Sequence, residues 1–364
     1  MDKYEKNLWL HNAFESFSKG VYSGTSLTKE HRIVLHKIND KYINKGVYVS
    51  EIIHTAAFDN LILSWNADTP VGTYIGIEAQ VLINKHNNPL WSDWLSFGTW
   101  NSNGISSSAP KALSSNELAY IETDTIKVKG TLGETAGAVR YKLTLTTEIP
   151  DKTPCVKLIA GTYRNSKENP SEFNLSSDFE PELIYLKKKL DVPCFSQMLQ
   201  DSKIASVICS PTSVAMILNY YGLKLTPIEV AGKVYDLEYK GYGNWPFNTA
   251  FAGSLGFEAY VLSCSSINDL KKEVYKGYPA AVSVKYKNSE KVEAKLPIIH
   301  AAPISKTYGH LIVVCGFTEE DNEEYIIVND PAAPSNEKVR VKYLLDEFEE
   351  AWQASGRIAY IIHP

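Results

Sequence analysis

Apolar and polar residues alternate along much of the chain before residue 160. Every second position of 75–83 is apolar, and the same holds for 139–145. Because successive side chains of a strand point to opposite faces, each stretch predicts a strand with one buried face. Polar turn sequences such as 66–70 and 130–133 separate these stretches, and helical periodicity is nearly absent. Many short strands without intervening helices favour an all-β sandwich of jelly-roll type.

The pattern changes near residue 180. Segment 164–183 is polar and contains Pro, Ser and Asn, which predicts a linker. After it, helical periodicity and strand alternation are mixed, as is typical of an α+β domain. The chain is therefore predicted to be multidomain, with a sandwich over 1–170 and an α+β domain over 180–364, each folding on its own. In the second part, helices are expected at 209–221, from 226, and at 248–255, 266–277 and 344–352, and strands at 279–285, 310–317, 324–330, 337–343 and 357–362.

Composition narrows the classes of function. The 364 residues are 44% hydrophobic and 22% charged, as in folded proteins, and their number suits two domains. The net charge of −5 gives no electrostatic reason to expect nucleic-acid binding. No apolar run approaches the roughly 20 residues of a membrane span, so none is expected. The N-terminal residues lack the apolar core of a secretion signal, so the chain as it reads is expected in the cytoplasm. An extracellular or cell-envelope location stays open if an export signal precedes it.

Cysteine usage points to one candidate nucleophile. The five cysteines are scattered, and the sequence contains neither a CxxC pair nor an HExxH motif, so we expect neither a disulfide framework nor a bound metal. Cys209 opens the predicted helix 209–221, and a helix N-terminus favours the thiolate form of a cysteine. The alternative is a small buried core residue. Cys194 is a weaker candidate because it follows Pro193 in an extended stretch, away from a helix start.

A histidine and an aspartate fit the other roles of a nucleophile relay. His310 begins one predicted strand and Asp330 ends the next, with a polar turn between them. If the two strands form a hairpin centred near residue 320, these residues are cross-strand neighbours. An aspartate that orients an imidazole, which in turn activates a nucleophile, is a catalytic triad. Taken singly, each residue is better explained as a polar residue at a strand edge, and it is the predicted pairing that favours the relay.

Gln197, in the loop before the predicted Cys209 helix, is a candidate oxyanion donor. Its side-chain amide and the backbone N–H of Cys209 would together bind the charge that develops on a substrate carbonyl. A glutamine in a loop is by itself usually solvated. The argument therefore rests on the order Gln197, Cys209, His310 and Asp330 along the chain.

These residues lie in motifs that resemble a known family. Residues 191–363 resemble a papain-like cysteine peptidase domain of the bacteriocin-processing, double-glycine-leader peptidase-like family, through DVPCFSQ, CSPTSVAMILNYYG, GNWPFNTAFAGSLGF, GHLIVVCGF and YIIVNDPAAP. The resemblance implies a papain-like α+β fold. It also implies roles for the four residues: Cys209 as nucleophile, His310 as general base, Asp330 as orienter and Gln197 as oxyanion donor.

Two further residues are expected near the substrate. Members of this family usually have Gly directly after the nucleophile, whereas this chain has Ser210. We expect Ser210 to contact and crowd the substrate channel, with altered backbone freedom as the alternative. Trp245 lies in the motif GNWPFNTAFAGSLGF and is a candidate wall of the substrate groove, with a packing role as the alternative.

The first half resembles, more weakly, the β-sandwich modules that precede such peptidase domains in bacterial proteins. The resemblance rests on SWNADTPVGTYIGIEAQV and WSDWLSFGTW. Sugars stack on aromatic rings, so one interpretation is a carbohydrate-binding face. The alternative is that the tryptophans, Trp65 and Trp94 above all, fill the sandwich core. The aromatic residues concerned are Trp65, Tyr74, Trp91, Trp94 and Trp100.

Together these features predict a thiol hydrolase that cleaves peptide or amide bonds of a peptide or protein substrate through an acyl-enzyme at Cys209. No metal or organic cofactor is expected, because a thiolate and an imidazole suffice. Two alternatives stay open. One is a catalytically weak or inactive papain-like module that binds a peptide or glycan, and the other is acyl transfer to an amine in place of hydrolysis. An amidase with a Cys-His-His triad is disfavoured because the third residue is Asp330.

Overall fold

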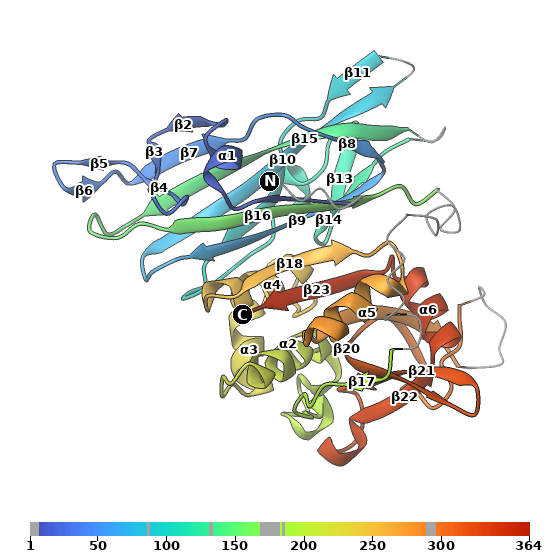
Figure 1. Cartoon of the computed structure of the whole chain (residues 1–364). Coiled ribbons are helices and arrows are strands. Elements are labelled where there is room, and N and C mark those ends of the chain that lie inside the picture. The colour runs from blue at the N-terminus through green and yellow to red at the C-terminus, as the bar shows by residue number, and fades with distance from the viewer. Residues whose placement is uncertain (1–6, 86–87, 131–133, 168–182, 184–185, 289–295) are drawn as a thin grey trace. The chain divides into compact units, whose positions relative to one another are not determined.

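The chain divides by its contacts into two compact units. The first comprises residues 1–168 and 233–261, and the second comprises residues 169–232 and 262–364. The segment 233–261 therefore belongs to the first unit, although it lies in the second half of the sequence. The computed structural model describes residues 7–85, 88–130, 134–167, 183, 186–288 and 296–364 (Figure 1).

The division into units bears on the predicted domains. Most of the predicted linker 164–183 lies outside the described residues. That the ranges 1–170 and 180–364 each fold alone stays a prediction. Along the sequence, the division at 232/233 falls within the helix α3 (Pro227–Val234), and the division at 261/262 falls within the strand β18 (Glu258–Ser263).

The first unit is an antiparallel β-sandwich, as the alternating pattern predicts, with seven described strands in each sheet. One sheet contains β1 (Leu8–His11), β3 (Thr25–Leu27), β4 (Ile33–Leu35), β9 (Asn60–Asp68), β13 (Ala119–Glu122), β14 (Thr125–Val128) and β16 (Cys155–Arg164). The other contains β2 (Val21–Ser23), β7 (Lys45–Val49), β8 (Ile53–Phe58), β10 (Thr73–Lys85), β11 (Asn88–Trp91), β12 (Leu95–Trp100) and β15 (Thr135–Thr147). Smaller elements are α1 (Phe14–Phe17), the pair β5 (Lys37–Ile38) and β6 (Lys41–Tyr42), and the 3-10 turn η1 (Lys111–Leu113).

The order of strands explains which residues fill the sandwich. The first sheet runs β13-β14-β9-β16-β4-β3, with β1 beside β16, and the second runs β11-β10-β15-β7-β2, with β12 beside β10 and β8 beside β15. The alternate apolar residues of 75–83 and 139–145 are buried, as their period of two requires. The long strands β10 and β15 pair with each other, so both apolar faces contribute to one core.

The helix α4 (Trp245–Ser254) also belongs to the sandwich unit. Its Phe247 ring lies 5.4 Å from the ring of Trp100 and 6.1 Å from that of Trp65, centroid to centroid. Near the end of segment 233–261, Ala259 is bonded to the side-chain amide of Asn66. That amide donates to the Ala259 carbonyl at 2.6 Å and accepts from the Ala259 N–H at 3.0 Å. Segment 233–261 thus shares the core and the hydrogen bonds of the sandwich.

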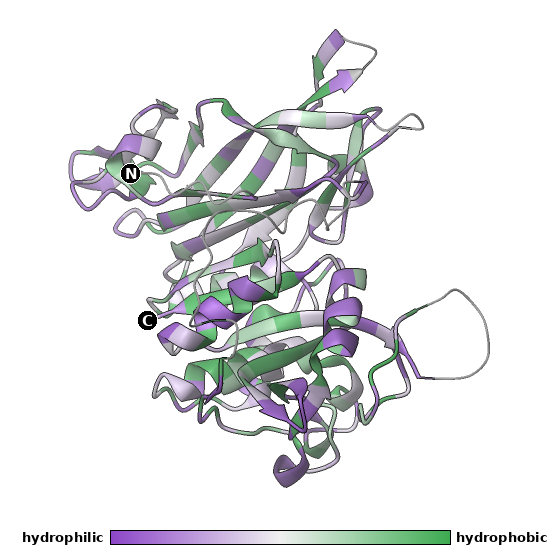
Figure 2. Ribbon diagram, turned by 45° about the vertical axis from the view of Figure 1, so that its right-hand side comes forward, coloured by the Kyte–Doolittle hydropathy of each residue, from purple (hydrophilic) through white to green (hydrophobic). Residues whose placement is uncertain are grey.

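The second unit has the α+β composition expected from its sequence. Its sheet includes the run β23-β19-β20-β21-β22, with β17 beside β20, and hydrophobic residues dominate the strands (Figure 2). The strands are β17 (Lys188–Lys189), β19 (Ala280–Lys287), β20 (Lys306–Glu320), β21 (Glu323–Asn329), β22 (Arg340–Leu344) and β23 (Ile358–His363). The helices are α2 (Cys209–Tyr220), α5 (Ile267–Lys276) and α6 (Leu345–Ala354), with 3-10 turns η4 (Gln197–Leu199), η5 (Ala205–Val207) and η6 (Asn336–Lys338).

Helix ends follow the local sequence signals. Thr226 and Glu229 form the predicted capping box of α3: the Glu229 N–H donates to the Thr226 hydroxyl at 3.2 Å, and the Glu229 carboxylate accepts from the Thr226 N–H at 2.7 Å. Gly277 ends α5 with a φ of 94°, a left-handed conformation that suits glycine. α4 begins earlier than the expected residue 248, because Asn244 caps it by accepting from the N–H of Phe247 at 3.2 Å.

Candidate active site

Cys209 is the first residue of α2 and is partly exposed. The N-cap residue Ile208 provides no side-chain cap, so the first backbone N–H groups of the helix are available to an anion. One turn on, the Ser213 hydroxyl donates to the carbonyl of Leu311 at 3.1 Å and anchors the helix start to β20. The helix therefore brings the thiol to the strand that carries His310.

His310 and Asp330 meet, with both side chains buried and a 2.7 Å hydrogen bond between Nε2 and Oδ1. The hairpin that joins them has a different register from the one expected. β20 and β21 pair Val313 with Asn329, and the turn lies at 321–322, where both residues have positive φ. A bulge also interrupts the pairing. Asp330 therefore lies just beyond the paired strand, and its side chain, not its strand position, brings it to the imidazole.

Both oxygens of the Asp330 carboxylate accept hydrogen bonds. Oδ1 accepts from the backbone N–H of Ala332 at 2.9 Å in addition to His310, and Oδ2 accepts from the hydroxyl of Tyr343 at 2.9 Å. Tyr343 comes from β22 and is 2% exposed. Tyr343 could not be singled out from the sequence, because a tyrosine in an alternating strand gives no sign of a polar contact. The carboxylate is thus fixed in orientation from two strands and from its own loop.

The thiol and the imidazole act on each other's ionisation. Burial by itself would raise the pKa of the Cys209 thiol, but the hydrogen bond and charge of His310, with the N–H groups of Leu311 and Ser210, lower the pKa below its usual value. Burial by itself would lower the pKa of His310, but Asp330 and Cys209 raise that pKa to about 10. Both shifts favour a thiolate beside an imidazolium. Since Nε2 is bonded to Asp330, Nδ1 is the ring nitrogen left for the thiol.

Asp330 completes this charge arrangement. Burial would raise the pKa of its carboxyl group, yet the charge and hydrogen bond of His310, the Ala332 N–H and the Tyr343 hydroxyl keep that pKa below its usual value. Asp330 therefore stays ionised and holds the imidazole in one orientation, as the third member of a triad does.

Gln197 is buried at the start of η4, ahead of α2. Its Nε2 donates to the carbonyl of Ala205 at 2.7 Å, and its backbone N–H donates to the carbonyl of Pro331 at 2.8 Å. These bonds hold it between the turn that precedes Cys209 and the residue that follows Asp330. A primary amide has a second N–H, which no described bond uses. The predicted role as an oxyanion donor stays a prediction.

Two residues that the sequence argument did not single out position the Gln197 loop. The Asn329 amide is fully buried and donates to the carbonyls of Val192 at 3.2 Å and Pro193 at 3.1 Å. Its oxygen accepts from Arg340 Nε at 3.1 Å, and Arg340 also bonds the carbonyl of Val192. The start of the Gln197 loop is thereby tied to the end of β21, which Asp330 follows.

Ser210 does not have the place expected of it. Its side chain is 1% exposed, and its hydroxyl is bonded to the hydroxyl of Tyr360 on β23 at 2.9 Å. Because the side chain is enclosed and its polar atom is engaged, it is not available to a substrate. We correct the predicted substrate contact to a packing role, while the Ser210 backbone N–H still acts on the Cys209 thiol.

Trp245 lies in the first unit, at the start of α4. Its backbone N–H donates to the buried carboxylate of Asp124 at 2.8 Å, and its side chain is partly exposed. The contact fixes the start of the helix to the sandwich. A role as a wall of the substrate groove stays a prediction.

The other cysteines lack the electrostatic environment of Cys209. Burial raises the pKa of Cys155 in the sandwich and that of Cys315 in β20, the latter to about 12. Cys264 is buried, as expected of a core residue. The thiol of Cys194 lies 3.7 Å from the Asn329 side-chain oxygen, so its neighbour is an amide and not a base.

The aromatic residues proposed for a carbohydrate face separate into two groups. Trp65 and Trp100 are 1% and 0% exposed and pack against Phe247, so they belong to the core and cannot line a surface. This corrects the predicted face for these two residues. The core alternative is right for Trp65 and wrong for Trp94, which is partly exposed.

Two of the remaining aromatic residues, Trp91 and Trp94, face basic side chains. The guanidinium of Arg140 lies 5.1 Å from the ring centroid of Trp91 and 5.3 Å from that of Trp94, and the Lys142 ammonium lies 4.6 Å from Trp94. These are cation–π distances, and the cations occupy ring surface that a sugar would need. Carbohydrate binding by Tyr74, Trp91 and Trp94 stays a prediction.

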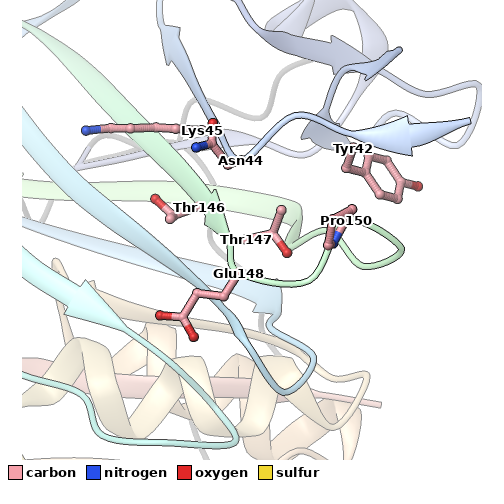
Figure 3. A pocket seen from close by; sticks show the side chains of 7 residues that line it. All are labelled: Tyr42, Asn44, Lys45, Thr146, Thr147, Glu148 and Pro150. Atoms are coloured by element: carbon pink, nitrogen blue, oxygen red, sulfur yellow. The ribbon is translucent and has the colours of Figure 1, made fainter. Parts of the chain in front are cut away.

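A separate pocket of about 440 Å³ lies in the sandwich unit. In Figure 3 the side chain of Lys45 extends away from the Tyr42 ring. The pocket has no cysteine and no histidine among its lining residues, so it does not repeat the thiol and imidazole of the Cys209 site. It is lined by Tyr42, Asn44, Lys45, Thr146, Thr147, Glu148 and Pro150.

Within the described part of the chain, no cluster of three or more His, Cys, Asp or Glu side chains has the arrangement to hold a metal ion. None of the helices in that part is long and apolar enough to span a bilayer.

Comparison with known families agrees with the motifs. Residues 189–360 match the model of the Peptidase_C39 like family, and residues 7–163 match the model of a Peptidase C39 N-terminal domain. The resemblance expected from the sequence is thereby confirmed for both halves, and so is the order of a β-rich part followed by an α+β part.

Individual relatives are distant. YvpB of Bacillus subtilis (strain 168), an uncharacterized protein, is 26% identical over 219 residues, which span 53% of this chain and 82% of YvpB. A crystal structure of a C39-like peptidase from Bacillus anthracis is 22% identical and covers 49% of this chain and 98% of its own, with a TM-score of 0.38. Digestive procathepsin L 3 of Tenebrio molitor is 12% identical and covers 55% of this chain and 79% of its own, with a TM-score of 0.35.

Proposed function

Because residues 189–360 match the model of the Peptidase_C39 like family, we propose that the protein is a thiol hydrolase that cleaves peptide or amide bonds through an acyl-enzyme at Cys209. The observation that carries the proposal is the continuous relay from a thiol of lowered pKa, through the His310 imidazole, to the buried Asp330 carboxylate. A relay of this kind has no evident use in a core that only packs, since burying its charges is costly.

The chemistry follows from where the charges lie. The Cys209 thiolate attacks the carbonyl carbon of the substrate, a C–S bond forms, and the carbonyl π electrons move to the oxygen. The N-terminal N–H groups of α2, with the Gln197 amide as a second donor, stabilise the resulting oxyanion. The His310 imidazolium gives its proton to the departing amine as the C–N bond breaks. The product of this half-reaction is a thioester on Cys209.

The second half-reaction restores the enzyme. Water attacks the thioester carbonyl while neutral His310 takes one of its protons, and the C–S bond breaks to release a carboxylic acid. The imidazolium and the thiolate are thereby regenerated. If an amine attacks in place of water, the same step transfers the acyl group, so product analysis in the presence of an added amine separates hydrolysis from acyl transfer.

A peptidyl electrophile that reacts with cysteine tests the proposal. We expect rapid labelling of Cys209, identified by mass mapping of the digested protein, and loss of that labelling in His310→Ala. Cys194→Ser is the matched control, because it removes the other partly exposed thiol of the second unit and should leave the labelling unchanged. Slow labelling spread evenly over several cysteines would instead favour the alternative of an inactive module that binds a peptide or glycan.

A further inference from the structure

Two buried tyrosines lie near the carboxylate of Asp330. Tyr343 of β22 donates its hydroxyl hydrogen to Oδ2 at 2.9 Å. Tyr286 of β19 is 1% exposed, and the carboxylate adds to the raising of its pKa, but its hydroxyl has no hydrogen-bond partner among the described residues. The two rings are alike in burial and chemistry and differ in whether they bond to the carboxylate.

We propose that Tyr343 is a positioning residue of the catalytic relay: its hydroxyl holds the free oxygen of Asp330 and so stabilises the charged state in which Cys209 is a thiolate. This inference rests on the function proposed above, and it assigns a role to a residue outside the triad.

Both oxygens of the Asp330 carboxylate are held by described donors. Asp330 Oδ1 already accepts from His310 Nε2 at 2.7 Å and from the Ala332 N–H at 2.9 Å. Oδ2 has the Tyr343 hydroxyl as its described donor, and Asp330 itself is 1% exposed. Without that donor, this buried carboxylate oxygen would lose its described hydrogen bond, which is costly. The Tyr343 bond also fixes the plane in which Oδ1 faces the imidazole.

The total charge of the buried site changes when Cys209 ionises. With the thiol protonated, the charges of His310 and Asp330 cancel. When Cys209 ionises, the relay carries one net negative charge, so any donor to the relay favours the thiolate. The titratable groups that bond to Asp330 are His310 from β20 and Tyr343 from β22. Tyr286 from β19 lies near the carboxylate without a described bond to it, and Cys209 acts on Asp330 through His310.

The Tyr343 hydroxyl itself stays protonated. Burial, followed by the charge of Asp330 and the hydrogen bond to it, raises the pKa of the tyrosine far above its ordinary value. The hydroxyl therefore remains a neutral donor wherever the thiolate exists. Its removal should loosen the relay without introducing any new charge.

The experiment measures the pH dependence of Cys209 alkylation by iodoacetamide in the full chain, read as the mass of the peptide that contains Cys209. Tyr343→Phe keeps the ring and removes the donor. We expect the midpoint of the alkylation profile to move to higher pH, and the rate at mildly acidic pH to fall by about tenfold, the size of a lost hydrogen bond to a charged group. Tyr286→Phe is the matched control and should leave the profile unchanged, because it removes a hydroxyl with no described partner.

A double-mutant comparison separates positioning from packing. If Tyr343 acts through Asp330, then Tyr343→Phe should shift the profile of the natural chain and have no further effect in an Asp330→Asn background. Equal shifts in both backgrounds, or equal shifts from Tyr343→Phe and Tyr286→Phe, would overturn the inference. So would an unshifted Tyr343→Phe profile when His310→Ala does shift it. If the natural chain itself alkylates like an ordinary thiol, the proposed function fails, which is a separate outcome.

Discussion

Each unit buries an aspartate, and the two carboxyl groups respond to burial in opposite ways. In the sandwich unit, Asp124 accepts from the N–H of Trp245 at 2.8 Å and from the hydroxyl of Thr125 at 3.0 Å, yet burial raises its pKa to about 7, and the charge of Asp236 adds to the rise. In the other unit, Asp330 is equally buried but has a lowered pKa.

The difference lies in the partners. Asp330 faces the cation of His310, whereas Asp124 has neutral donors and a second acid as its neighbours. Hydrogen bonds alone do not keep a buried carboxylate charged, but hydrogen bonds with a paired cation do. Two aspartates of similar burial thus differ in the direction of their pKa shift according to whether a cation lies next to them.

The acids of the sandwich unit hold backbone in place. Asp236 accepts from the N–H of Ser108 at 2.9 Å and from its hydroxyl at 3.0 Å, and it also accepts from the amide of Asn244 at 2.8 Å. Asp124 bonds the first N–H of α4. Both carboxyl groups therefore fasten segment 233–261 to the sandwich, although the sequence of that segment lies within the peptidase family match.

The largest effect should come from removing the sandwich. The sequence suggests that 180–364 folds alone, but segment 233–261 packs Phe247 against Trp65 and Trp100. Truncation to 180–364 exposes this aromatic face. The loss of large buried side-chain contacts costs about 3–5 kcal/mol each, which is comparable with the roughly 5–15 kcal/mol stability of a whole domain. We expect the truncated chain to show no cooperative thermal unfolding by circular dichroism.

A control for that experiment is the full chain with Phe247→Ala, which should unfold at lower temperature but still cooperatively. A truncated chain that folds, and whose Cys209 alkylates as in the full protein, would contradict the need for the sandwich core and support the boundary expected from the sequence.

The next largest effect concerns the cation that distinguishes Asp330 from Asp124. His310→Ala removes the group that lowers the pKa of the Cys209 thiol, so alkylation by iodoacetamide should shift toward alkaline pH. Hydrolysis of any substrate should fall by about three to four orders of magnitude, as in other triads. The matched variant His300→Ala removes an exposed histidine of the same unit, bonded to Glu347, and should change neither. An alkylation profile that His310→Ala leaves in place would contradict the ion pair.

A smaller effect separates the two carboxylates by pH. The folded pKa of Asp124 is raised to about 7, so its contribution to stability is present below its unfolded pKa and is lost as pH rises through 7. The free energy of unfolding should therefore fall between about pH 4 and 7 by an amount on the order of a few kcal/mol. Asp124→Asn should flatten this fall in urea titrations, and Asp93→Asn, at an exposed position, should not. For Asp330 the sign is reversed: its contribution is present above its unfolded pKa and is lost as pH falls through its lowered folded pKa.

The urea titrations could contradict the prediction for Asp124 in two ways. If Asp124→Asn leaves the pH dependence between 4 and 7 as it was, then the acid is ionised in the folded chain and the contrast with Asp330 is not electrostatic. A flattening by Asp93→Asn of the same size would point to general charge effects on the sandwich.

Many helices and strands of the second unit can be predicted from the sequence, because helix starts, helix ends and strand alternation depend on residues close together in the chain. The helix expected at 209–221 is found at Cys209–Tyr220, and Gly277 ends α5 as predicted. The meeting of His310 with Asp330 also followed from strand order alone. The register did not, because a β-bulge depends on packing and leaves no mark in the alternation of side chains.

What the sequence could not predict depends on partners far away along the chain. The apolar residues of α4 show that the helix is buried but not against what, and its partners Trp65 and Trp100 lie in the first half of the chain. In the same way, strand alternation predicts that Tyr343 is buried but does not indicate that its hydroxyl bonds to Asp330. The family resemblance supplied the roles of the triad, and it likewise gave no information about such supporting contacts.

The smallest effect is expected at Ser210, the residue that departs from the usual glycine. Its hydroxyl bonds that of Tyr360 inside the second unit at 2.9 Å, so Ser210→Ala should lower the free energy of unfolding by about 1 kcal/mol, the typical size of one neutral hydrogen bond. The Ser210 backbone N–H that acts on Cys209 remains in this variant, so the alkylation profile of the thiol should not move. Tyr360→Phe removes the same bond from the other side and should cost a similar amount. If Ser210→Ala changes substrate affinity or labelling by the peptidyl electrophile while stability is unaffected, the side chain reaches the substrate after all, and the packing role assigned to it here is wrong.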